Sequence, residues 1–103
     1  MSGPDEIIHQ SVRLKIMAAL NALPRNGVAD FAQLKAITGA SDGNLGAHIT
    51  TLETAGYIAV TKEFVGKKPR TTLAITKIGR KAFEQHVAFL RDILDGNVAP
   101  DGT

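Results

Sequence analysis

The sequence predicts a mainly helical α+β fold in which helical segments precede a two-stranded hairpin and a last helix follows it. Apolar residues recur every three or four positions over residues 6–23, 30–55 and 77–94, the period of helices with one buried face. Between residues 57 and 76 they alternate with polar residues, which is the period of a strand. We expect one domain, 1–103, because a chain of this length buries about two-thirds of its unfolded surface in one core.

Composition excludes several classes of site. Hydrophobic residues make up 44% and charged residues 21%, as in soluble globular domains. The chain has no cysteine, which excludes disulfides, thiolate zinc sites and cysteine nucleophiles. No two histidines stand at ligand spacing, so neither a metal nor another cofactor is expected. The apolar run 16–20 is too short for a membrane span and no signal-peptide pattern is visible, so we expect a cytoplasmic protein.

The first predicted helix spans residues 6–23. It ends before Pro24, which cannot continue the hydrogen-bond ladder of a helix. Residues 9–11 are a weak point at which the helix could begin late or break. The expected buried stripe consists of Ile8, Val12, Ile16, Leu20 and Leu23.

Residues 30–55 have the pattern of a helix-turn-helix. Asp30 suits an N-cap, with Gln33 completing a capping box, and Gly39 suits the left-handed residue that ends a helix. Ser41 can cap a second, longer helix that runs to about residue 55. The expected buried positions are Phe31, Leu34 and Ile37 in the first helix and Leu45, Ile49 and Leu52 in the second.

Residues 57–76 form the predicted hairpin. Its two strands flank a five-residue turn, 66–70, whose glycine and proline interrupt a strand. Thr76 can cap the last helix, 77–94, and residues 95–103 are expected to be a frayed tail because they lack periodic apolar residues.

Basic residues are concentrated in the hairpin and the start of the last helix. Residues 62–81 hold seven basic side chains against one acidic, whereas residues 1–61 and 82–103 are each net negative. Such a surplus favours a polyanionic partner, with a merely solvated surface as the alternative.

This order of elements describes a winged helix, and particular residues extend the comparison. The segments SDGNLGAHITTLETAGYI, KEFVGKKPRTTLAIT and KIGRKAF resemble the MarR/ArsR-like winged-helix transcriptional regulators, in particular a small archaeal and bacterial branch with a GKKPRT-type wing. The resemblance covers about residues 8–90. It departs from the family at Gly46-Ala47, where relatives more often carry a polar or basic pair, and in lacking the cysteine-rich metal sensor of many ArsR members.

The resemblance implies a sequence-specific regulator of transcription that binds double-stranded DNA as a homodimeric repressor. The recognition helix, 41–55, would enter the major groove, and the basic wing would contact the minor groove or the backbone. Asn44 can pair with adenine, and hydroxyls of the helix can donate to phosphates. The expected DNA contacts are Ser41, Asp42, Gly43, Asn44, Ala47, His48, Thr50, Thr51, Lys67, Lys68 and Arg70.

Several of these residues have structural alternatives. Asn44 could serve only the start of its helix, and His48 could be a half-buried packing residue. The basic residues Lys77, Arg80 and Lys81 could merely decorate an exposed helix start. We expect the hairpin aromatics Tyr57 and Phe64 to belong to the core rather than to stack on bases.

The last helix carries two adjacent apolar rows, Ala82, His86, Phe89 and Ile93, and Phe83, Val87, Leu90 and Leu94. If one row covers the chain's own core, the other stays exposed and predicts a two-fold dimer built from helix 77–94 together with the first helix, with Phe83, Val87, Leu90 and Leu94 at the interface. Such a dimer places two recognition helices roughly 34 Å apart on a palindromic operator. A stripe buried wholly within one chain is the alternative.

Other functions remain open at this stage. The resemblance also implies that a small-molecule effector, not identified by any residue, can bind between the DNA-binding part and the dimer helices. A winged helix can instead serve as a protein-binding adaptor or as a subunit of a larger transcription assembly. An enzyme is not expected, because no residue pattern supplies a nucleophile or a paired acid and base.

Overall fold

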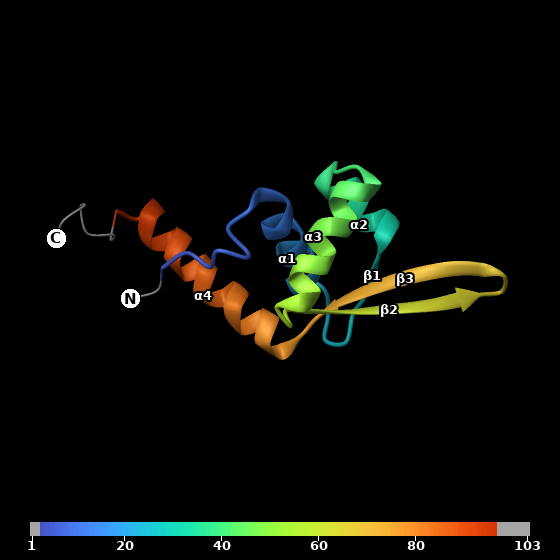
Figure 1. Ribbon diagram of the computed structural model, residues 1–103. Coiled ribbons are helices and arrows are strands. Elements are labelled where there is room, and N and C mark those ends of the chain that lie inside the picture. Colours follow the sequence, from blue (N-terminus) through green and yellow to red (C-terminus); the bar gives the residue numbers. More distant parts are fainter. Residues whose placement is uncertain (1–2, 97–103) are drawn as a thin grey trace.

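The computed structural model describes residues 3–96 of the protein (Figure 1). A central group of short helices lies between two projecting elements, the hairpin on one side and the last helix on the other. The elements are α1 (Ser11–Asn21), β1 (Ala29–Asp30), α2 (Phe31–Thr38), α3 (Asp42–Thr54), β2 (Ile58–Val65), β3 (Lys68–Ile75) and α4 (Lys77–Leu94). Of the predicted tail, residues 97–103 lie outside the described residues.

The first helix is shorter than predicted, since α1 begins at Ser11 rather than at residue 6. The Gln10 side chain accepts a hydrogen bond from the Arg13 amide and so caps the helix there. Upstream, one Asp5 carboxylate oxygen accepts from the amides of Ile7 and Ile8 and holds this segment in a turn. Side-chain capping therefore decided the break that the sequence indicated at residues 9–11.

The helix-turn-helix follows the prediction closely. Asp30 and Gln33 form the capping box, Gly39 adopts the left-handed conformation with φ 71°, and Ser41 caps α3. The three predicted positions of α3 are buried. The prediction was wrong at Ile37, which is exposed in the last turn of α2.

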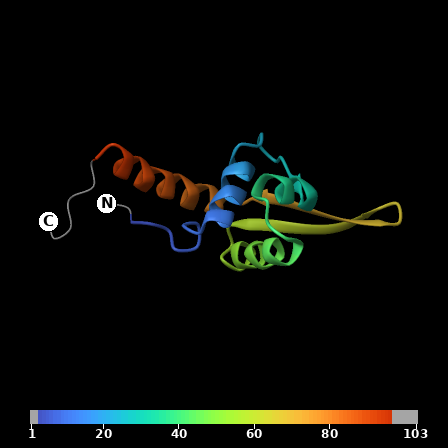
Figure 2. The same cartoon turned by 90° about the horizontal axis from the view of Figure 1, so that it is seen from above.

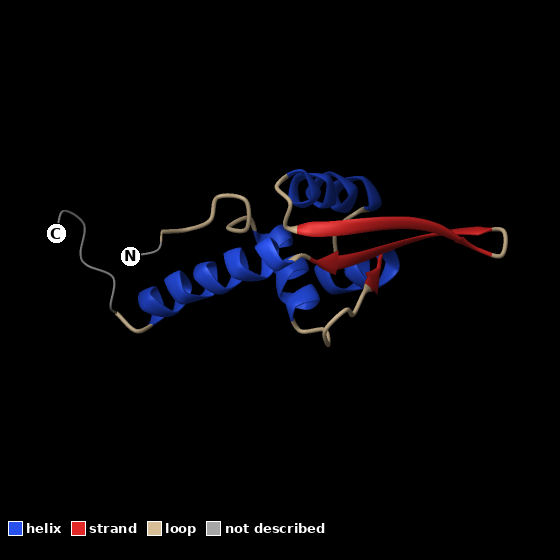
Figure 3. Cartoon of the chain, turned by 90° about the horizontal axis from the view of Figure 1, so that it is seen from below, coloured by secondary structure: helices blue, strands red, loops and turns tan. Residues whose placement is uncertain are grey.

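The sheet has three antiparallel strands in the order β1-β3-β2, whereas the sequence predicted two. Strand β1 has only two residues, opposite Thr72 and Leu73, and is too short to show a period. Figure 3 shows it at the base of the hairpin, which continues well beyond it. The predicted five-residue turn was also wrong, because Lys68 to Arg70 belong to β3. Pro69 is tolerated there since β1 does not extend to this part of β3.

The core lies between the central helices and one face of the sheet. In Figure 2, α2 and α3 flank the base of the hairpin, and they contact β3 and β2 respectively. Fully buried apolar side chains come from the N-terminal segment and from α1, α2, α3 and the sheet: Ile8, Ile16, Met17, Leu20, Leu34, Leu45, Leu52 and Leu73. In the part of the chain that the structure describes, no helix is long and apolar enough to cross a membrane.

Helix α4 begins against the start of β2. Thr76 caps the helix by accepting from the Gly79 amide, and its hydroxyl donates to the Gly56 carbonyl at 2.6 Å. Its amide donates to the Tyr57 carbonyl at 3.1 Å. A Cβ built on Gly79 would lie 2.0 Å from that same carbonyl oxygen, so only glycine permits this approach.

The N-terminal segment is tied across the junction by Asp5. Its amide donates to Nδ1 of His86 at 3.1 Å, and its carboxylate accepts from the Tyr57 hydroxyl at 2.7 Å. Burial, this hydrogen bond and the Asp5 charge raise the pKa of Tyr57 to about 12. His86 is 1% exposed, and its Nε2 has no partner among residues 3–96. Asp5 thus joins the N-terminal segment to Tyr57, just before β2, and to His86 in α4.

We expect Gly79→Ala to lower the free energy of unfolding by about 1–3 kcal/mol, because the Tyr57 backbone must move to admit the methyl group. Urea denaturation measures this. Gly46→Ala is the matched control, since its added Cβ meets nothing within 4 Å. In this control the free energy of unfolding should rise by about 0.5–1 kcal/mol, because alanine favours a helix over glycine. A Gly79→Ala protein as stable as the unsubstituted protein would refute the close-approach argument.

We also expect the protein to lose stability in mild acid through His86. Burial, and secondarily His9, lower the pKa of His86 below its usual 6.5, while the Asp5 charge acts in the opposite direction. Below pH 6.5 the unfolded chain therefore binds a proton that folded His86 resists, and stability falls until the pH reaches the lowered pKa. Denaturation midpoints between pH 7 and 5 should fall less in His86→Gln than in the unsubstituted protein. Equal pH dependence in both would contradict this.

Candidate nucleic-acid interface

The face of α3 opposite the core is open to solvent. Because Leu45, Ile49 and Leu52 turn inward, the remaining positions point outward or sideways. Of the predicted contact residues in and before this helix, only His48 is half-buried. The exposed ones are Ser41, Asp42, Gly43, Asn44, Ala47, Thr50 and Thr51.

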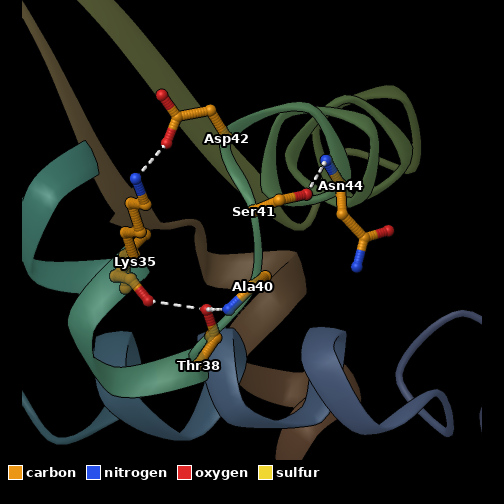
Figure 4. A network of polar contacts seen from close by, with 7 residues as sticks. Lys35, Thr38, Ala40, Ser41, Asp42 and Asn44 are labelled. Carbon is orange, nitrogen blue, oxygen red and sulfur yellow. Dashed lines mark hydrogen bonds and ion pairs between the residues drawn. The ribbon is translucent and has the colours of Figure 1, made fainter.

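Asn44 serves the helix start through its backbone alone. Its amide donates to the Ser41 hydroxyl at 3.3 Å, while its carboxamide extends away from the helix (Figure 4). The side chain is therefore available for a bidentate contact outside the protein.

The Asp42 side chain is directed toward α2 by an ion pair with Lys35, whose Nζ lies 2.6 Å from the carboxylate (Figure 4). The pair joins α2 to the first turn of α3, and both side chains are exposed enough that its contribution to stability is small. Its main effect is to neutralise an acidic charge beside the predicted DNA surface. No sequence pattern marks Lys35, because the conformation of the turn between α2 and α3 brings these two side chains together.

The hydroxyls of Thr50 and Thr51 turn back onto their own helix. They donate to the carbonyl oxygens of Gly46 at 3.0 Å and Ala47 at 3.2 Å. Each hydroxyl has one hydrogen, so in this conformation neither is free to donate to a phosphate as the sequence suggested.

His48 packs beside α1, where Arg13 approaches its Nδ1 through a guanidinium nitrogen at 3.0 Å. Since arginine can only donate, Nδ1 accepts and the imidazole is neutral. Burial, and then the Arg13 charge, lower the pKa of His48. This environment favours the packing interpretation of His48 over a phosphate contact.

The outer half of the wing is exposed on both faces. Lys68 and Arg70 lie opposite Val65 and Glu63, and Lys67 stands in the turn. The three predicted basic contacts therefore gather in the outer half of the hairpin (Figure 1), where Lys68 and Arg70 also line a pocket with the start of α2.

The prediction that Phe64 belongs to the core was wrong, because its side chain is 74% exposed. It shares the strand face of buried Ile58, but it lies six residues further along β2, toward the exposed tip of the hairpin. Tyr57, at the hairpin base, does pack against the core.

Arg80 does not decorate the surface of α4, as the sequence allowed. It donates to the Asn21 backbone carbonyl at 3.3 Å and to the Asn21 side-chain oxygen at 2.8 Å. It thus fixes the end of α1 to α4, whereas Lys77 and Lys81 are exposed.

Burial divides α4 along its length rather than into one covered and one exposed row. Phe83 is 8% exposed and His86 1%, although they belong to different rows. Leu94, at the far end, is 83% exposed, and Ile93 beside it is also exposed. Phe83 therefore offers little surface to a partner, contrary to its predicted place in an exposed row.

A groove of ≈ 570 Å³ lies along α4 and the end of α1, lined by Asn21, Phe83, Glu84, Val87, Ala88, Arg91, Asp92 and Asp95.

Comparison with known proteins agrees with this geometry. The family "Winged helix DNA-binding domain" matches residues 12–94. A protein of Methanocaldococcus jannaschii is 33% identical over 82 residues, which cover 80% of this chain and 86% of that protein. The structure of a transcriptional regulator homologue from Pyrococcus horikoshii OT3 superposes with a TM-score of 0.78 at 29% identity, covering 92% of this chain and 91% of that one.

A MarR-family transcriptional regulator from Porphyromonas gingivalis W83 has the same fold at 21% identity. It superposes with a TM-score of 0.68 and covers 87% of this chain and 84% of that one. These matches confirm the predicted mainly helical α+β fold with a wing hairpin.

Proposed function

Because the chain belongs to the family of winged-helix DNA-binding domains, we propose that it is a homodimeric repressor that binds a specific palindromic double-stranded DNA operator. The general class of the protein is that of DNA-binding regulators of the winged-helix, MarR-like type. It is not an enzyme, since its family and fold are those of transcriptional regulators.

The observation that carries the proposal is the combination of an open α3 face with a basic wing tip. Asn44 extends its free carboxamide from α3, and Lys67, Lys68 and Arg70 gather on the exposed hairpin. A helix of this kind fits the major groove, where all four base pairs are distinguishable. Arginine in a neighbouring minor groove and lysines near phosphates would then fix the register.

The dimer part of the proposal is supported by the far end of α4. Exposed apolar side chains such as Ile93 and Leu94, next to an open groove, are typical of a partner surface. The groove also carries Arg91 among the carboxylates Glu84, Asp92 and Asp95. Two copies related by a two-fold axis can pair the arginine of each with acidic residues of the other.

The proposal includes a small-molecule effector of unidentified chemistry, as the resemblance implies. It would bind between the DNA-binding part and the dimer helices.

A protein-binding adaptor is the competing function. The basic wing favours DNA, because counterion release from phosphates requires clustered lysine and arginine whereas an adaptor surface does not. The two functions differ in their response to salt.

We expect replacement of Lys67, Lys68 and Arg70 by alanine to weaken operator binding and to reduce the log–log salt dependence by roughly one unit for each lost phosphate contact. Titrations of labelled DNA at several salt concentrations measure both effects. Lys15→Ala, Lys77→Ala and Lys81→Ala together form the charge-matched control and should change the slope less. An unchanged slope in the wing variant would mean that the wing does not contact phosphate.

We expect the protein to be a dimer at micromolar concentration by light scattering. Leu94→Lys should weaken the dimer by about 1.5–3 kcal/mol, because the free energy gained by burying this leucine in the interface would be lost. The fold should persist, since Leu94 is exposed within the chain. Ile78→Lys, at an exposed apolar position in the first turn of α4, should leave the mass unchanged. A monomeric mass for the unsubstituted protein would refute the dimer.

A further inference from the structure

The outward face of α3 is built from small side chains. Gly43, Ala47, Thr50 and Thr51 are exposed there, and Gly46 is half-buried. A Cβ added at Gly43 or at Gly46 would meet nothing within 4 Å. The helix, DGNLGAHITTLET, contains neither arginine nor lysine. Another surface can therefore approach its backbone closely.

Polar side chains within residues 42–51 of α3 are mostly engaged within the protein. Asp42 pairs with Lys35, His48 with Arg13, and the two threonine hydroxyls with carbonyls of their own helix. Within residues 42–51, all of which the structure describes, Asn44 is the polar side chain whose functional group has no partner. The Asn44 carboxamide is thus the main polar group with which this helix can contact base edges.

The threonine hydrogen bonds also decide which groups face outward. In Thr50 and Thr51 the hydroxyl branch of Cβ is directed to the carbonyl four residues earlier, as is common for threonine inside helices. The methyl branch is then the one left for the solvent side. Together with the Ala47 methyl group, these methyls form a small apolar patch beside Asn44.

Each base pair presents a different chemistry to such a surface in the major groove. Guanine is read most often by arginine or lysine, which α3 lacks. Thymine carries a methyl group that packs against alanine and threonine methyls, and adenine pairs bidentately with asparagine.

From this match we propose that the half-site read by α3 is A·T-rich, with thymine methyl groups packed against Ala47, Thr50 and Thr51 and an adenine bonded by Asn44. This inference rests on the proposed function, since it names the DNA that the same surface takes. The wing is compatible with it, because narrow minor grooves of A·T-rich DNA attract arginine.

The first step of the test is selection of genomic DNA fragments by the protein at physiological salt. Recovery of an inverted repeat supports the proposed function, and A·T-rich half-sites support the inference. Uniform recovery or none would overturn the proposed function itself. A specific repeat with half-sites read through G·C pairs would overturn the inference alone.

The second step removes the thymine methyls. Deoxyuridine replaces thymidine at single positions of the selected operator, which deletes only the 5-methyl group. Affinity should fall about fourfold for each contacted methyl, the value expected for one buried methyl-sized group. Operators whose affinity is unchanged by every such substitution would overturn the inference, while the specific repeat would still support the proposed function.

Matched protein variants complete the test. Thr50→Ser and Thr51→Ser keep the hydroxyl and its helix bond but remove the methyl, so they should weaken binding to thymine DNA and not to the corresponding uracil DNA. Thr54→Ser, at the end of the same helix beyond the expected base contacts, should behave like the unsubstituted protein. Asn44→Ala should lose the preference for adenine at one position by about tenfold. Serine variants that discriminate thymine from uracil as the unsubstituted protein does would overturn the methyl contacts.

Discussion

The arrangement of the molecule depends on one close backbone contact, between Gly79 and the carbonyl of Tyr57. Tyr57 begins the wing and Gly79 lies in the first turn of α4, so this contact fixes how the two projecting elements leave the core. Thr76 strengthens it by capping α4 while donating to Gly56. Because backbone meets backbone here, no flexible side chain can absorb a change.

Two further ties make this junction rigid. Asp5 joins the N-terminal segment to Tyr57 and His86, and Arg80 joins the end of α1 to α4. All of them use polar groups at the edge of the core, where a hydrogen bond fixes direction as well as proximity. These ties fix the position of α4 relative to the core that carries α3, as the proposed binding of a two-fold operator would require.

The proposed interface separates its two tasks between elements. In the proposed complex the wing would supply the positive charge that gives affinity for any DNA. Helix α3 would not, because it has no basic residue, Lys35 pairs with Asp42, and Glu53 is acidic. Contacts of α3 are short-range and depend on the shape and chemistry of base edges. Salt and base sequence should thus act on different parts of the protein.

The sequence by itself determined the elements whose signals are local. The Asp30 and Ser41 caps, the left-handed Gly39 and the stripe of Leu45, Ile49 and Leu52 follow from nearest neighbours along the chain, and the structure has them as predicted. The tertiary structure alone decided the strand β1, the exposure of Phe64 and the hydrogen bonds of Arg80 to Asn21. The physical reason is that these depend on where segments distant in sequence come to lie, and a periodic pattern records which face is apolar but not whether another element is there to cover it.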